Sequence, residues 1–298
     1  MIFHKPILLN EVIEGLNIVP HGVYCDFTFG GGGHSRKILE KLGAKGRLVA
    51  FDQDEKAIEN VWDDDRLILI RSNFRYADKF LRYLGIEKVD GVLADLGVSS
   101  HQLDVDSRGF TYRDRNELDM RMNRKQKLNA VDILNTYSES ELVSVFSGYG
   151  EIRNSKQLAK AFVRSRMTGK IRNSSDIDRI IGTVIKGEKN RYLAQLYQAI
   201  RIEVNDEFGA LKQMLGFLEN ILKPGGRLTV ISFHSLEDRF VKNLIKKSDV
   251  EGNISTDIYG RQIFKFREVV KGVVVAGKEE LYQNSRAKSA KLRIAERL

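Results

Sequence analysis

A run of four glycines after a short apolar segment is the feature that most constrains the fold of this chain. The segment Val23–Phe29 is typical of a buried β-strand, Gly30–Gly33 forms a turn, and the apolar spacing beyond Ser35 predicts a helix. Glycine permits positive φ angles and lets a ligand approach the main chain closely. The start of the helix offers unpaired N–H groups and a partial positive charge. We therefore expect the first strand–helix turn of a nucleotide-binding α/β sheet, with the ligand at the carboxyl ends of the strands.

Further apolar segments alternate with helical patterns and predict the rest of this sheet. The second and fourth predicted strands each end in an acid, Asp52 and Asp95 respectively. Strands that alternate with helices are typical of a parallel, doubly wound sheet. We expect the additional strands at residues 46–52, 67–70, 89–95 and 227–233, and a closing pair at 263–266 and 290–294.

A long stretch in the middle of the chain departs from this alternation and shows mainly helical patterns. Ser138 and Glu141 form a capping-box pattern, and the apolar residues that follow share one helical face. We therefore predict a discontinuous sheet domain, residues 1–104 and 206–298, with residues 105–205 inserted as an all-helical domain with its own small core.

The positive charge of the chain, +9 overall, is unevenly distributed. Residues 105–205 contain 19 Lys and Arg against 12 Asp and Glu, a net charge of +7, and residues 261–298 contain 10 against 4, a net charge of +6. The remainder contains 20 against 24 and is slightly acidic, at −4. This division indicates a polyanionic partner, most simply nucleic acid, although a solvated basic surface would have the same composition.

Composition sets further limits. Hydrophobic residues make up 42% of the chain, which is enough for a sizeable core. The single cysteine, Cys25, can form neither an internal disulfide nor a cysteine zinc cluster, and we expect no metal site. No apolar run approaches the roughly 18 residues that span a bilayer, and the N-terminus lacks a signal peptide's apolar core. We expect a cytoplasmic protein without a membrane association.

Two cofactor classes fit the glycine turn. A dinucleotide site favours G-x-G-x-x-G, but Gly30 and Gly32 place Ser35 where the third glycine belongs. Asp52 can hold ribose hydroxyls in either class, unless it merely caps a helix. Asp95 suits a ligand with a sulfonium and an ammonium group, as in S-adenosylmethionine, and suits a pyrophosphate poorly. His34 by itself is equally compatible with a capping or surface role.

Motifs spread over nearly the whole chain resemble those of one family. The chain resembles the bacterial 16S ribosomal RNA cytosine-(N4)-methyltransferases. The matching segments are residues 4–12, 23–35, 95–104, 108–110, 118–122, 149–151, 198–202, 204–205, 232–239 and 284–293.

The resemblance implies an S-adenosylmethionine-dependent enzyme with a class I methyltransferase (Rossmann-like) sheet and a helical insertion that recognises RNA. The implied substrate is a cytidine in the decoding region of 16S rRNA, methylated on its exocyclic N4 amine, and the implied partner is the small ribosomal subunit. Phe74 and Gln102 enter the cofactor site through the resemblance alone. The cofactor contacts that it implies are Gly32, Gly33, His34, Asp52, Phe74, Asp95 and Gln102.

A target base must leave its stack to reach such a site, and aromatic or Arg side chains can hold it. Phe110, Tyr112 and Arg121 are hypothetical candidates for this role. His234 is a candidate proton acceptor or base contact, with hydrogen bonding inside its own turn as the alternative. The residues assign no catalytic base and no oligomeric state.

Three other functions compete with this one. A methyltransferase for amines in DNA would keep the cofactor site, but many such enzymes have an Asn/Asp-Pro-Pro-aromatic motif where this chain has Asp95-Leu96-Gly97-Val98. An NAD-dependent oxidoreductase is disfavoured by Ser35 and Asp95. A non-catalytic RNA-binding or assembly protein is disfavoured by the acids at both strand ends.

Overall fold

The computed structural model describes residues 6–99, 108–112 and 117–298, and it divides into two compact units. The sheet unit comprises Met1–Gly97 and Phe208–Leu298, and the helical unit comprises Val98–Glu207. The segment for which we predicted an insertion, residues 105–205, lies inside the helical unit.

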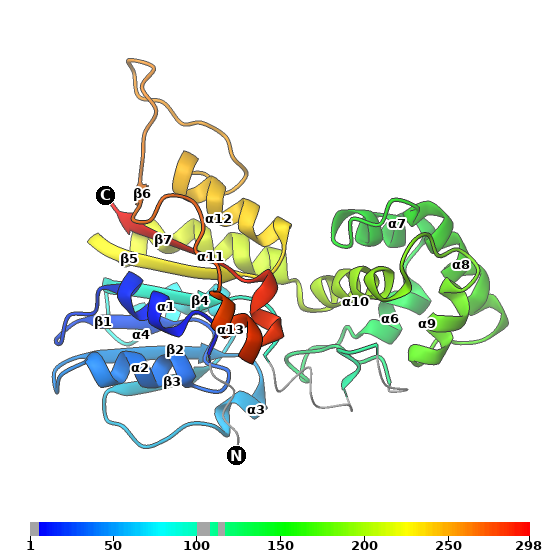
Figure 1. The fold of residues 1–298 in the computed structure, drawn as a ribbon, viewed down its shortest axis with the longest axis horizontal. Helices are drawn as coiled ribbons and strands as arrows, with labels where there is room; N and C mark the ends of the chain where they lie inside the picture. Colours follow the sequence, from blue (N-terminus) through cyan, green and yellow to red (C-terminus); the bar gives the residue numbers. More distant parts are fainter. Residues whose placement is uncertain (1–5, 100–107, 113–116) are drawn as a thin grey trace. The chain divides into compact units, whose positions relative to one another are not determined.

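The sheet unit is built on seven strands in the order β3-β2-β1-β4-β5-β7-β6 (Figure 1). The first five strands pair in parallel, whereas β7 is antiparallel to both of its neighbours, β5 and β6. Parallel neighbours direct their carboxyl ends to the same edge, where the predicted acids stand. The strands are β1 (Val23–Asp26), β2 (Arg47–Asp52), β3 (Leu67–Arg71), β4 (Val89–Asp95), β5 (Leu222–Ser232), β6 (Phe266–Glu268) and β7 (Lys291–Arg297).

Helices cover both faces of this sheet. Successive strand residues point to opposite faces, so Tyr24 packs in one apolar cluster with α1 and α2, while Cys25 packs in another with α4, α11 and α12. Because both faces are buried, the strands are continuously apolar rather than alternating. The helical elements are α1 (Leu9–Leu16), α2 (Gly33–Lys41), α3 (Glu55–Ile58), η1 (Phe74–Tyr76), α4 (Ala77–Tyr83), α11 (Glu207–Ile221), α12 (Ser235–Lys247), α13 (Lys278–Gln283) and η3 (Ser285–Ser289).

Several strand boundaries differ from the sequence prediction. β1 ends at Asp26 rather than at residue 29, although Phe27 N still donates to Leu93 O and Phe29 N to Phe51 O, both at 2.9 Å. β5 begins at Leu222, five residues before the predicted start, because it also pairs with β4 at Val89 across an irregular register. The closing pair is present as β6 and β7, which are antiparallel, but β6 spans Phe266–Glu268 where residues 263–266 were predicted, and β7 spans Lys291–Arg297 where 290–294 were predicted.

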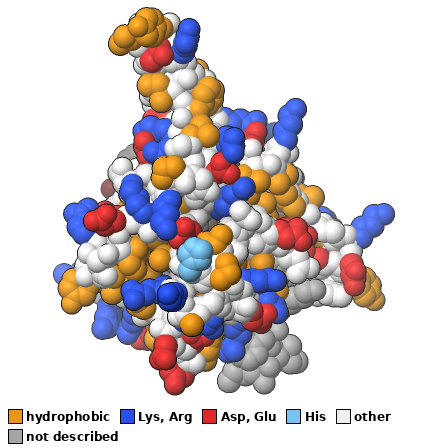
Figure 2. Space-filling model, turned by 90° about the vertical axis from the view of Figure 1, so that its left-hand side faces the viewer, with side chains coloured by type: hydrophobic (Ala, Val, Ile, Leu, Met, Phe, Trp, Pro, Cys, Tyr) orange, Lys and Arg blue, Asp and Glu red, His pale blue; other side chains and the backbone are white. Residues whose placement is uncertain are grey.

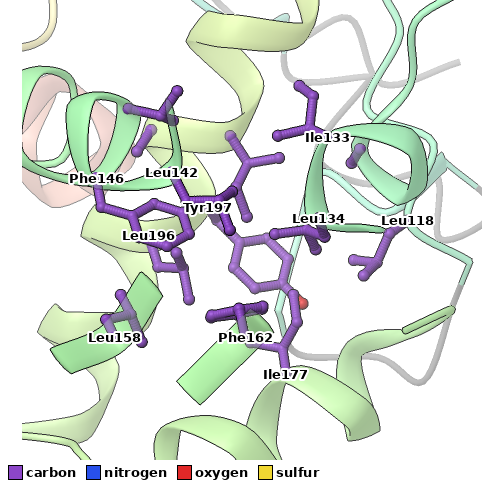
Figure 3. Packing of buried hydrophobic residues seen from close by; sticks show 14 of the residues in the cluster. Leu118, Ile133, Leu134, Leu142, Phe146, Leu158, Phe162, Ile177, Leu196 and Tyr197 are labelled. Atoms are coloured by element: carbon purple, nitrogen blue, oxygen red, sulfur yellow. The ribbon is translucent and has the colours of Figure 1, made fainter. Parts of the chain in front are cut away.

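The helical unit has a separate apolar core. Figure 3 shows Phe146, Phe162, Leu142 and Leu196 directed toward one another in this core, and Phe146 and Phe162 lie 5.5 Å apart between ring centroids. Ser138 caps α7 in the predicted capping box with Glu141. The helices are α6 (Ala130–Thr136), α7 (Glu139–Gly148), α8 (Ser155–Thr168), α9 (Ser174–Ile181) and α10 (Lys189–Asn205).

Among the described residues, none of the helices combines the length and the apolar character that a bilayer span requires.

Candidate cofactor site

The glycine turn exposes its main chain at the carboxyl edge of the sheet. Gly30 and Gly32 have φ angles of 53° and 73°, in the left-handed region that favours glycine, and Gly32 caps α2. A Cβ atom on Gly31 would meet no other atom within 4 Å, so there is open space beside this peptide. A Cβ on Gly32 would lie 2.6 Å from the Trp62 ring. The turn therefore leaves room for a ligand at Gly31 and none for a side chain at Gly32.

Asp52 holds the glycine turn in place from the end of β2. Its Oδ2 accepts a hydrogen bond from Gly30 N at 2.8 Å, and its Oδ1 accepts one from Asp54 N at 2.8 Å. Burial raises the pKa of this carboxyl to about 6, and the two N–H donors oppose that rise. Asp54 caps α3 by accepting from Lys56 N, so the capping alternative for Asp52 is wrong.

A network around Asp26, which the sequence analysis did not single out, connects the turn to its neighbours. Asp26 Oδ2 accepts from Ser35 Oγ at 2.7 Å, and Oδ1 accepts from Thr28 N at 3.0 Å. Thr28 Oγ1 in turn accepts from Asp95 N at 2.7 Å, which links the ends of β1 and β4. Ser35 thus replaces the third glycine with a hydroxyl that fixes α2 to β1. The sequence signal that could have identified Asp26 is an acidic residue within an otherwise apolar strand.

Asp95 and His34 carry buried polar atoms that lack hydrogen-bond partners in the described part of the chain. His34 is only 7% exposed, and its Nε2 lies 3.8 Å from Asp95 Oδ2, too far for a hydrogen bond. Within the described residues, both ring nitrogens and Asp95 Oδ1 lack hydrogen-bond partners. Burial lowers the pKa of His34 to about 4, so the ring is neutral at pH 7. Buried polar atoms without partners indicate a ligand that supplies them.

Two other carboxyl groups act on the carboxyl group of Asp95. Burial raises the pKa of Asp95 to about 8, with further contributions from the charges of Asp26 on β1 and Glu237 on α12. Like charges in a poorly solvated site disfavour ionisation. A cationic ligand reverses this effect, which fits the sulfonium and ammonium groups of S-adenosylmethionine.

Phe74 follows β3, and the neighbouring strand β2 ends at Asp52. Asn73 caps the 3₁₀ helix that Phe74 begins, and its Nδ2 donates to Gln53 Oε1 at 2.9 Å. The Phe74 ring stacks on Phe27, with centroids 6.3 Å apart and planes inclined by 20°. Its partial burial leaves part of the ring available to a ligand. Gln102, the remaining predicted contact, lies outside the described residues.

The comparison with protein families decides what kind of protein has this site. The MraW methylase family matches the chain over residues 1–298. The chain belongs to the MraW methylase family.

Full-length relatives of this MraW-family chain share about half of its residues. A protein from Phocaeicola vulgatus called "Ribosomal RNA small subunit methyltransferase H" is 50% identical over 297 residues, covering 99% of this chain and 98% of that protein. A protein of the same name from Bacteroides thetaiotaomicron is 51% identical over 296 residues, covering 99% and 97%. A solved rRNA methylase from Streptococcus thermophilus is 12% identical, with a TM-score of 0.40 over 100% of this chain and 99% of that chain.

Membership of the MraW family confirms three of the sequence predictions. The protein is a methyltransferase, its cofactor is S-adenosylmethionine, and its sheet unit has the class I methyltransferase fold. The alternatives of an NAD-dependent oxidoreductase and of a non-catalytic assembly protein are thereby set aside. In the described ranges, no group of three or more His, Cys, Asp or Glu residues is arranged to hold a metal ion.

His234 has a structural position in the turn after β5. It caps α12 by accepting from Glu237 N at Nδ1 over 3.4 Å, and its Nε2 lies 3.2 Å from Glu237 Oε1. Glu237 Oε2 accepts from Phe233 N at 2.9 Å. The cap therefore uses Nδ1 of His234, whereas the buried Nε2 has no hydrogen-bond partner in the described part of the chain and is compatible with either alternative.

The three candidates for holding the target base lie in the helical unit and are engaged there. Phe110 is buried in its core, and the ring of Tyr112 contacts that of Tyr197 with centroids 5.8 Å apart. Arg121 forms an ion pair with Asp119 at 2.5 Å and donates to Gln126 O at 2.8 Å. These contacts stabilise the segment before α6 and argue against the base-holding hypothesis for Phe110 and Arg121.

The helical unit also contains a pocket of about 370 Å³. Tyr137 donates to Glu203 Oε1 at 2.7 Å in its wall, and Glu141 adds a second carboxyl group. A pocket with two carboxylates is unsuited to phosphate. It is lined by Tyr137, Ser140, Glu141, Ser144, Val145, Tyr149 and Glu203.

The glycine turn allows a matched test of its packing. We expect Gly32→Ala to lower the free energy of unfolding by about 1–3 kcal/mol, because the residue has positive φ and its Cβ would collide with Trp62. Gly31→Ala is the control and should leave stability nearly unchanged, since its Cβ enters open space. Urea unfolding followed by circular dichroism measures both. Equal stability of the two variants would contradict this packing.

Proposed function

We propose that the protein methylates the exocyclic N4 amine of a cytidine in the decoding region of 16S rRNA. The observation that carries the proposal is the agreement between full-length relatives named for the small-subunit ribosomal RNA and a cofactor site suited to a cation. The motif resemblance supports the finer assignment of base and atom. The partner is then 16S rRNA in the small ribosomal subunit, and the place of action is the cytoplasm.

We assign the cofactor contacts to the residues that meet at the carboxyl edge of the sheet. S-adenosylmethionine supplies the methyl group when bound. Asp52 orients ribose hydroxyls, Phe74 offers its ring to the adenine, and Asp95 faces the cationic end. The turn residues Gly32 and Gly33 offer main-chain atoms. His34 and Gln102 complete the proposed set.

The amine of cytosine is a poor nucleophile because its lone pair is delocalised into the ring. Holding the base and the methyl donor in line accounts for much of the catalysis in such a transfer. A hydrogen-bond acceptor beside the amine would localise the lone pair and stabilise the developing positive charge. The strand end at Asp95 is the proposed location of this acceptor, and no catalytic base is assigned.

The helical unit is the proposed RNA-recognition element, and α8 presents a basic face. Lys156, Lys160 and Arg164 follow one another at helical spacing and are exposed. No ion pair is recorded for them within the described part of the chain. Such side chains are available to RNA phosphates.

Salt dependence tests this assignment. We expect the triple substitution Lys156→Gln, Lys160→Gln, Arg164→Gln to weaken rRNA binding and to reduce the slope of log affinity against log salt concentration by about 2. Filter binding with 16S rRNA at several salt concentrations measures both quantities. The matched control replaces exposed Lys41 and Lys45 of the sheet unit by Gln. An unchanged slope would count against α8 as an RNA-binding face.

The basic residues of the C-terminal segment 284–298 belong to a part of the chain that the sheet requires. The segment contains β7, which lies between β5 and β6 and buries Leu292, Ile294 and Ala295. Its loss would remove a strand from the sheet and expose both apolar clusters.

The direct test is a methyl-transfer assay on small ribosomal subunits purified from cells that lack the enzyme. Tritiated S-adenosylmethionine reports the transfer, and mass spectrometry of digested nucleosides identifies the product. We expect N4-methylcytidine from a single position in the decoding region. Methylation of DNA alone, or of another nucleoside, would overturn the proposed substrate.

A further inference from the structure

Exposed apolar side chains are concentrated in one short segment of the sheet unit. Sixteen large hydrophobic residues are exposed in the described parts of the chain, and nine of them fall within residues 254–275. A concentration of this kind marks an interaction surface. Figure 2 shows hydrophobic side chains at the end of the projecting segment, with charged side chains beside them. The nine are Ile254, Ile258, Tyr259, Ile263, Phe264, Val269, Val270, Val273 and Val275.

The outer part of this segment is a short hairpin between α12 and β6, which we call the finger (residues 249–265; Figure 1). Asp257 N donates to Arg261 O at 2.9 Å, and Thr256 forms an antiparallel bridge with Gln262. Asp257 Oδ1 accepts from Tyr259 N at 2.8 Å and from Arg261 N at 2.9 Å, which closes the tip. The hairpin is thus held by its own hydrogen bonds.

The base of the finger is fixed to the end of α12. Gln262 Nε2 donates to Lys246 O at 3.1 Å, and Lys265 N donates to Ser248 Oγ at 2.7 Å. The tip side chains nevertheless point away from the protein, with Ile258 91% and Tyr259 78% exposed. An element whose backbone is already ordered loses little entropy when it binds.

The residues of the finger fit RNA through the exposed aromatic ring of Tyr259 and the guanidinium group of Arg261. Tyr259 and Phe264 alternate with Arg261 and Lys265. The finger has three acids against two bases, but its acids are engaged within the protein: Glu251 pairs with Lys212 at 2.7 Å, and Asp249 and Asp257 accept main-chain N–H groups. Lys265 is paired with Glu219 at 2.6 Å, whereas Arg261 has no recorded ion pair within the described residues. Unpaired RNA bases stack on aromatic side chains, and nearby Arg groups neutralise their phosphates.

We propose that the finger is a second RNA-binding element of the enzyme, in which Tyr259 and Ile258 pack against unpaired rRNA bases and Arg261 contacts the adjoining phosphate. This inference rests on the proposed rRNA substrate. The finger belongs to the sheet unit and uses none of the residues of the cofactor site or of α8.

The test compares a tip variant with a matched surface variant. The double substitution Ile258→Ser, Tyr259→Ser removes the apolar tip and leaves Asp257 to close the turn. Tyr83→Ser is the control, because Tyr83 is 87% exposed on α4. We expect the tip variant to bind 16S rRNA and small ribosomal subunits about tenfold more weakly, or weaker still, by filter binding. Its melting temperature and its affinity for S-adenosylmethionine should equal those of the unaltered protein.

Each other outcome has a distinct meaning. Unaltered RNA affinity of the tip variant, with RNA binding by the parent protein, overturns the finger alone. Failure of the parent protein to bind 16S rRNA or small subunits overturns the proposed function, and the finger inference with it. Sedimentation that shows a dimeric parent protein and a monomeric tip variant assigns the tip to a second copy of the chain instead. Ultraviolet crosslinking of 16S rRNA at Tyr259, located by mass spectrometry, is the expected positive result.

Discussion

The substitution Asp95→Asn is expected to lower the affinity for S-adenosylmethionine by about two orders of magnitude at pH 8.5. Asp95 is the partly exposed carboxyl group beside an unpartnered His34, and a cation loses its counter-charge when this group becomes an amide. Removal of one partner from a desolvated charge pair costs about 2–5 kcal/mol, and 1.4 kcal/mol corresponds to a tenfold change. Titration calorimetry with S-adenosylmethionine measures the loss.

Two controls accompany this measurement. Asp65→Asn changes an exposed acid of the same unit and should leave the affinity unaltered. The unfolding free energy of Asp95→Asn should not fall, because burial already makes the charged form of Asp95 unfavourable in the folded protein. Undiminished cofactor affinity in Asp95→Asn would remove Asp95 from the site.

The second large effect is a pH dependence of cofactor affinity. Burial, Asp26 and Glu237 raise the pKa of Asp95 to about 8, so the carboxyl group is mostly protonated in the free protein at pH 7. A bound cation favours the carboxylate and lowers this pKa, so binding releases a proton. The contribution of Asp95 to the affinity therefore rises with pH, by up to about tenfold per pH unit, and levels off above about pH 8. Calorimetry in two buffers of different ionisation enthalpy counts the released proton.

Two other groups of the site titrate below the window between pH 7 and 8. His34 is already neutral there, because its pKa is about 4, and Asp52 titrates at about pH 6. The ligand's own ammonium group titrates at about pH 7.7–8.0, so Asp95→Asn is the essential reference. Glu237→Gln removes a neighbouring charge and should move the rise to lower pH. The same pH profile in Asp95→Asn as in the parent protein would contradict this mechanism.

The sequence alone predicted the sheet and the principal acids of the site. Strands buried on both faces are continuously apolar, so their positions can be predicted from the sequence without knowing which strands they pair with. In a parallel sheet all carboxyl ends meet at one edge, so a glycine turn after one strand and acids after two others predict a common site. Asp52 and Asp95 are indeed at that edge, connected through Gly30 and Thr28.

The sequence alone did not show which groups the individual polar side chains contact. An arginine such as Arg121 is a residue type that often contacts RNA. Here a turn brings Asp119 within 2.5 Å of it, and the two side chains form an ion pair. His234 has the chemistry of a base, and its place at the start of α12 makes Nδ1 a cap while Nε2 has no hydrogen-bond partner among the described residues. In both cases the competing partner lies only two or three residues away, and only the backbone conformation shows that it is reached.

What the sequence by itself determined is therefore the class of sheet, the glycine turn and the edge at which the acids gather, because these follow from local patterns and strand direction. What only the tertiary structure decided is the electrostatic character of that edge. The environment of Asp95 depends on Asp26 from β1 and Glu237 from α12, which are distant in sequence. Strand order and register bring these groups together, and burial then converts their proximity into a raised pKa, because a poorly solvated carboxylate has little other stabilisation.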